Sequence, residues 1–212
     1  MKMAVKPILF NTEMVRAILY GRKTCTRRIP SKHSREAYST YSYWASARKK
    51  MSGKEFYEKY PLYQLGDILY VRETWSEGYE EGTYIYRADD KFAEHPTFKE
   101  SSKHIWNPSI HMPKEAARIW LKVTDVRIER LQKCGEGRCL DIEKEGITTP
   151  QDPILYTNDN KYHDALKSEF KKIWDSTIKK SDRDRYCWKA NPWVWVISFE
   201  RCEKPEIFDP WE

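Results

Sequence analysis

The sequence predicts a mixed α+β fold, mainly β, with about five to six short strands in a small barrel and helices against its mouth. Short segments that alternate apolar and polar residues recur along the chain, and turn-forming residues separate them. Few segments show the 3.6-residue apolar period of an amphipathic helix. Many short strands with few helices favour a barrel. The chain has only eight glycines and no glycine-rich phosphate loop, which argues against a dinucleotide-binding unit.

The first elements lie in residues 5–28. Residues 5–10 form a short strand, and residues 12–20 form a helix that Asn11 or Thr12 caps. Gly21 ends this helix, because a glycine there adopts a positive φ without a Cβ clash. Beyond it the chain turns and extends, and alternation places Thr24, Thr26 and Arg28 on one face.

The middle of the chain supplies three strands. A Gly66-Asp67 turn leads into an alternating strand that ends near Trp75, and Thr83–Ala88 is its expected hairpin partner. A turn of helix after Pro113 precedes a long strand over 119–131.

The last third contains most of the helical signal. A short helix is expected around 140–145, closed by Gly146, and a long amphipathic helix over 161–178. The last strand is 193–199. We expect a single domain over residues 1–204, with inserts at about 31–63 and 89–104 and a peripheral tail at 205–212.

Composition limits the class of protein. A third of the residues are charged, mean hydropathy is −0.84, and no apolar run approaches the ~20 residues of a membrane span. The first 20 residues show no signal-peptide pattern, and five cysteines lack framework spacing. We therefore expect a cytoplasmic protein with reduced thiols, with Cys25 as the one candidate for a reactive thiol.

Charge is distributed unevenly along the chain. Residues 1–63 contain 14 Lys/Arg and 4 Asp/Glu, whereas the whole chain carries only +6. A basic N-terminal third suggests a nucleotide or polyanion partner. Within it, residues 31–63 interleave aromatic and cationic side chains, which suits single-stranded nucleic acid or a packed satellite cluster equally.

The stretch from Gly21 to Arg28 concentrates the candidate chemistry. It places Lys23 three residues from Thr26, among three arginines. Neighbouring cations and burial both lower the pKa of a lysine, so its amine could accept the proton of a threonine hydroxyl. The alternative is a basic loop that binds phosphate or is simply solvated.

These residues resemble a known family. The pattern Gly21-x-Lys23-x-x-Thr26-x-Arg28, followed by Gly66-Asp67-x-Leu69-x-Val71-Arg72-Glu73, resembles an ASCH domain, a member of the PUA-like β-barrels. The segments from Trp106 to Pro113 and from Asn191 to Val196 are similar to ASCH proteins of phages and prophages. Many ASCH domains carry Glu where Thr26 stands. The Lys-x-x-Thr pattern is similar instead to the small bacterial ASCH enzymes that hydrolyse N4-acetylcytidine.

The resemblance implies a function and site residues. It implies a metal-independent amidohydrolase without a cofactor, in a bacterial host cell, with Lys23, Thr26 and Glu145 as catalytic residues. It also leaves open a non-catalytic module that binds RNA, single-stranded nucleic acid or a modified nucleoside, and a ribonuclease. Residues expected to contact the substrate or nucleic acid are Arg22, Thr24, Arg27, Arg28, Arg72, Glu73, Trp75 and His111, although His111 beside a proline also suits a structural role.

Overall fold

The computed structural model describes residues 3–30, 59, 61–78, 80–89, 106–135, 140–148 and 159–206. The aromatic insert, except for residues 59 and 61–63, and most of the 89–104 insert and of the tail lie outside these residues. The chain divides into two compact units, one of residues 1–21, 66–123 and 199–212 and one of residues 22–65 and 124–198. Strands β6 (Trp120–Arg130) and β7 (Trp193–Cys202) contribute to both, and the single domain over 1–204 stays a prediction.

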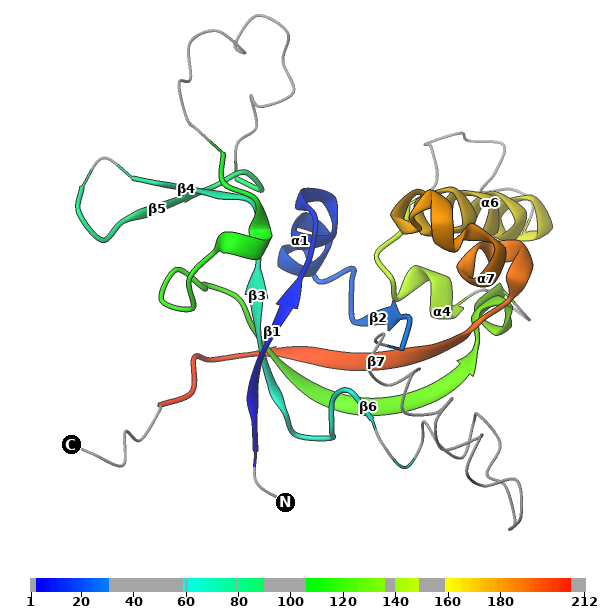
Figure 1. Ribbon diagram of the computed structural model, residues 1–212, viewed down its shortest axis with the longest axis horizontal. Coiled ribbons are helices and arrows are strands. Elements are labelled where there is room, and N and C mark those ends of the chain that lie inside the picture. Colours follow the sequence, from blue (N-terminus) through cyan, green and yellow to red (C-terminus); the bar gives the residue numbers. More distant parts are fainter. Residues whose placement is uncertain are drawn as a thin grey trace, which may run out of the picture. The chain divides into compact units, whose positions relative to one another are not determined.

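The first unit begins with the predicted strand and helix. Strand β1 (Val5–Leu9) pairs in parallel with β3 (Ile68–Arg72), with Ile8 opposite Val71. Between them α1 (Thr12–Leu19) is capped by Asn11, whose side chain accepts a hydrogen bond from Met14 N at 2.9 Å. Gly21 follows the helix with φ of 72°, as predicted. Figure 1 shows α1 following directly from β1.

The predicted hairpin of the first unit is partly wrong. Thr83–Ala88 was expected to pair with the strand from Gly66 to Trp75, but that strand is broken after Arg72. Strand β3 pairs with β1 and, antiparallel, with β6, whereas β5 (Tyr84–Tyr86) pairs with the separate short strand β4 (Trp75–Glu77). The break occurs at Glu73, whose N–H turns to the sulfur of Met112.

The connection before β6 also differs from its prediction. The turn of helix lies before Pro113, as the 3-10 helix η2 (Ser109–His111). A buried cluster of Ile68, Trp75, Met112, Ala116, Ala117 and Trp120 forms the core beneath these segments.

The second unit contains β2 (Cys25–Arg28), which pairs antiparallel with β7, Thr26 lying opposite Ile197. The short helices η3 (Leu131–Gly135) and α4 (Leu140–Glu143) follow β6. The long helix α6 (Asp159–Thr177) confirms the amphipathic pattern, because Leu166, Phe170 and Trp174 are buried.

Three short helices between α6 and β7 were not predicted. They are η4 (Lys180–Asp182), α7 (Arg183–Tyr186) and η5 (Trp188–Ala190). Trp174 ties α6 to this segment, because its Nε1 donates to Tyr186 O at 2.8 Å. Figure 1 shows α6 and α7 side by side.

The sheet confirms the mixed, mainly β class. Its five strands follow the order β1-β3-β6-β7-β2, and β4 and β5 form a second sheet of two strands. The order ends at β1 and β2, so the described strands close no barrel. No helix of the described part of the chain is long and apolar enough to cross a membrane.

Candidate functional site

The second unit brings Lys23 and Glu145 together. The two residues form an isolated antiparallel β-bridge, and the Nζ of Lys23 donates to Glu145 Oε2 at 2.7 Å and to Glu145 O at 3.0 Å. Lys23 is 3% and Glu145 5% exposed, so both charged groups lie away from bulk water. The turn of chain between α4 and Gly146, where φ is 76°, presents this carboxylate to the segment that follows α1.

An irregularity lies between Lys23 and Thr26. The N–H groups of Thr24 and Cys25 both donate to the carbonyl of Lys144, at 2.8 and 3.0 Å. Two residues opposite one partner is the pattern of a β-bulge, which inserts one extra residue into a strand. Lys23 and Arg27 nevertheless bind the same carboxylate, and Cys25 contacts Arg27, so Lys23, Cys25 and Arg27 lie on one face.

Burial does not distinguish the two faces of this segment. Thr26 is 4% exposed, and its neighbours Cys25 and Arg27 are equally buried, whereas Thr24 is exposed. Both faces of this segment are therefore covered, and burial alone does not place the hydroxyl of Thr26 beside the amine of Lys23.

Arg27 completes the buried network around Glu145. Its NH1 donates to Glu145 Oε1 at 3.0 Å, and its NH2 donates to Glu129 Oε1 at 3.0 Å. NH1 also reaches the carbonyl of Asp141 at 3.3 Å. Glu145 thus binds one cation with each carboxylate oxygen. This guanidinium, 5% exposed, is directed at protein carboxylates, so Arg27 orients Glu145 rather than presenting its charge to solvent.

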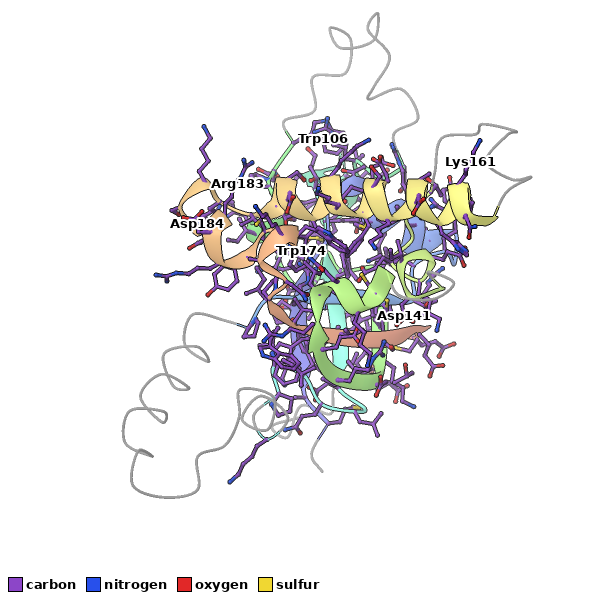
Figure 2. All side chains as sticks on the ribbon, turned by 90° about the vertical axis from the view of Figure 1, so that its right-hand side faces the viewer. Trp106, Asp141, Lys161, Trp174, Arg183 and Asp184 are labelled. Carbon is purple, nitrogen blue, oxygen red and sulfur yellow. The ribbon has the colours of Figure 1, made fainter. Side chains whose placement is uncertain are left out.

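The charges of this network balance. Lys23 and Arg27 face Glu145 and Glu129, and the outer pair of Arg127 and Asp141, 3.1 Å apart, adds one charge of each sign. Buried charges are tolerated only when they are paired and hydrogen-bonded. Figure 2 shows Asp141 projecting from the α4 segment.

The electrostatic field of the network shifts several pKa values. Burial acts to lower the pKa of Arg27. The neighbouring charges, Glu145 first among them, act to raise it, and the net shift of the pKa is upward. Burial, with Glu145 in second place, raises the pKa of Cys25 to about 12. Cys25 is therefore a neutral thiol near neutral pH, and a reactive thiolate at this position is not supported. Burial lowers the pKa of Arg28 below its ordinary value.

Arg22 contacts the residue that follows Glu145. Its NH1 donates to Gly146 O at 3.0 Å, and the residue is exposed. Arg22 and Thr24 are thus the two exposed members of the predicted binding set in this unit.

The remaining predicted residues belong to the first unit and form a different network. Glu73, 1% exposed, accepts both bonds of a bidentate pair from Arg118, at 2.9 and 3.1 Å. Arg72 donates to the carbonyl of Met112 at 2.7 Å. Trp75 is buried against Tyr84, and His111 is exposed on η2.

Burial raises the pKa of Glu73, and the hydrogen bonds and charge of Arg118 oppose that shift. Arg118 also stacks over Tyr86, with Cζ 3.9 Å from the ring centroid, and pairs with Asp89. Through these contacts Glu73, Arg72 and Trp75 stabilise the turn between β3 and β4.

Sequence reasoning missed Glu129, Asp141 and Arg118. A signal for Glu129 was present, because Asp125, Arg127 and Glu129 are spaced by two within a strand and alternate in sign. Such a row predicts paired charges along one face, and Arg127 does lie 2.9 Å from Asp125 and 3.5 Å from Glu129. Nothing comparable marks Asp141 or Arg118.

Comparison with known proteins gives no match to a family model, a curated protein sequence or a solved structure. The function must therefore be argued from the site itself. Within the described ranges no three His, Cys, Asp or Glu side chains are grouped as metal ligands.

Proposed function

We propose that the chain is an ASCH-type protein with a PUA-like core, and that its site hydrolyses an N4-acylated cytosine nucleoside. The observation that carries this proposal is the buried pair of Lys23 and Glu145, 2.7 Å apart, with a buried threonine three residues from the lysine. Hydrolysis of an amide requires an activated hydroxyl, a proton acceptor and stabilisation of an oxyanion. The segment from Lys23 to Arg28 supplies each of these groups.

In the first step Thr26 Oγ attacks the acyl carbon, and Lys23, in those molecules in which it has released its proton and is the neutral amine, takes the hydroxyl proton. The C–N bond then breaks, and the exocyclic amine of cytosine leaves with that proton. Water hydrolyses the threonine ester, which releases the carboxylic acid and restores Thr26. Arg28 or a backbone N–H faces the oxyanion.

Glu145 orients the lysine in this mechanism. A neutral amine has two N–H groups and one lone pair. The two acceptors of Glu145, at 2.7 and 3.0 Å from Nζ, match the two N–H groups, and the lone pair then points elsewhere. Arg27 fixes the other oxygen of Glu145 and so holds this arrangement in place.

The test compares three variants on N4-acetylcytidine, with free cytidine and acetate as the products to be measured. Thr26→Ala and Lys23→Ala should each abolish turnover. Lys23→Arg keeps a cation beside Glu145 but cannot act as a base, because a guanidinium does not lose its proton in proteins. It should therefore keep the fold and lose turnover.

A second candidate function is a non-catalytic reader of a modified base or RNA. The same close contact with Glu145 favours it, because a lysine held in an ion pair suits binding without proton transfer. In that case the wild type binds oligonucleotides and releases no product. Incubation with labelled RNA in a parallel reaction distinguishes the hydrolase and the reader from a ribonuclease, because only a ribonuclease would shorten the RNA.

A further inference from the structure

The C-terminal half of α6 carries a basic groove outside the site. The groove has a volume of about 510 Å³ and is lined by Ser168, Lys171, Lys172, Asp175, Ser176 and Arg183. This size falls within the range of about 300–1,000 Å³ of ligand pockets. Such pockets are usually lined by apolar residues, whereas every side chain that lines this groove ends in a polar or charged group.

The lining follows the period of a helix. Its five residues from 168 to 176 are spaced by three, one, three and one, which places them on one face of α6. Leu166, Phe170 and Trp174 occupy the opposite, buried face. Eight residues of helix span about 12 Å.

Charge favours an anion in this groove. Three cations line it against one carboxylate, and Asp175 Oδ1 already accepts a hydrogen bond from Trp188 N at 2.7 Å. Lys172 lies 3.2 Å from Glu169 on its own helix. Neither the Lys171 ammonium nor the Arg183 guanidinium has an ion-pair partner within the described part of the chain, and both residues are exposed.

We propose that this groove binds the phosphate backbone of single-stranded RNA, so that the substrate is a base within a polynucleotide rather than a free nucleoside alone. The inference rests on the proposed function for the identity of its ligand, since the groove and the site belong to the same unit. Lys171, Lys172 and Arg183 contact phosphates, and the serine hydroxyls donate to their oxygens.

The experiment measures binding of a fluorescent, unmodified oligocytidine RNA by anisotropy between 0.05 and 1 M salt. Each phosphate contact on a single strand contributes about 0.7 to the slope of log Kd against log salt. If the variant and the wild type bind RNA equally at 1 M salt, loss of one phosphate contact should weaken binding about eightfold at 0.05 M salt. Lys171→Glu and Arg183→Glu should each show this loss with a reduced slope.

Lys161→Glu is the matched control. It makes the same change of charge on the first turn of α6, and Figure 2 shows Lys161 and Arg183 at opposite ends of that helix. It should leave the slope unchanged. Equal losses in Lys161→Glu and Lys171→Glu, or no measurable RNA binding by the wild type, would overturn the proposal.

The outcome for the groove is separable from that for the site. Because the groove variants leave Lys23, Thr26 and Glu145 intact, turnover of free N4-acetylcytidine should not change. If the nucleoside is not hydrolysed but RNA binding depends on Lys171 and Arg183, the proposed hydrolase fails and the groove remains. If the nucleoside is hydrolysed and the groove variants bind RNA like the wild type, the groove proposal alone fails.

Discussion

Breaking the pair of Lys23 and Glu145 from either side should have unequal effects on stability. Lys23→Met removes one cation, and Glu145 keeps Arg27 as a partner at 3.0 Å. Glu145→Gln removes the carboxylate that both cations share, which leaves the Lys23 ammonium buried beside a neutral amide. Loss of the shared carboxylate should therefore cost more.

The structure gives the size of the effect. With an effective dielectric constant of about 20, Glu145 attracts Lys23 at 2.7 Å by about 6 kcal/mol and Arg27 at 3.0 Å by about 5.5 kcal/mol. Desolvation offsets much of this attraction, and removal of one partner of a buried pair costs about 3–5 kcal/mol. We expect about 3 kcal/mol for Lys23→Met and about 5 kcal/mol for Glu145→Gln. The double variant should be more stable than the sum of the two by about 1–3 kcal/mol.

Urea unfolding followed by tryptophan fluorescence measures these differences, and the chain has nine tryptophans. Lys144→Met is the control, because it makes the same substitution at a side chain that is 58% exposed. It should change the free energy of unfolding by less than about 1 kcal/mol. Additive costs in the double variant, or a smaller cost for Glu145→Gln than for Lys23→Met, would refute the shared-carboxylate arrangement.

Three further perturbations test other features. Gly21→Ala should lower the free energy of unfolding by about 1–2 kcal/mol, because φ is 72° at this position, and Gly21→Asn should lower it by less. Urea unfolding measures both variants, and equal costs would show that the positive φ is not the cause. At pH 8 iodoacetamide should label half-buried Cys187 and spare Cys25, whose pKa is about 12, until urea is added; mass spectrometry of peptides decides this. Arg118→Met leaves Glu73 without the interactions that oppose the rise of its pKa. A carboxyl whose folded-state pKa is raised loses stability as pH rises through that value, so this variant should be destabilised more at pH 7 than at pH 4. Equal losses at both pH values would be evidence against it.

Local patterns predicted most elements of the fold. Asn11 and Gly21 bound the first helix because a cap and a positive φ are properties of single residues. The stripe of Leu166, Phe170 and Trp174 predicted α6 because burial follows helical period.

Pairing between strands could not be predicted in the same way. The alternation from Gly66 to Trp75 is continuous in sequence, yet Glu73 leaves the ladder because Met112 and Arg118 bind it. Those partners lie 39 and 45 positions further along the chain, and no local pattern predicts them. The parallel pairing of β1 with β3 depends on equally distant contacts.

The candidate site shows both limits at once. Lys23 and Thr26 are visible as a motif, but uninterrupted alternation would place them on opposite faces of a strand. In the structure Lys23, Cys25 and Arg27 all contact the segment from Asp141 to Glu145, as that alternation predicts. The carbonyl of Lys144, in the same segment, accepts from two consecutive N–H groups. The residue that pairs with the lysine and the backbone carbonyl that holds the lysine's segment are therefore neighbours in sequence. A change in the chain around Lys144 would therefore move the carboxylate and the lysine segment together. The proposed chemistry requires the hydroxyl of Thr26 and the amine of Lys23 to reach one substrate with this segment in place.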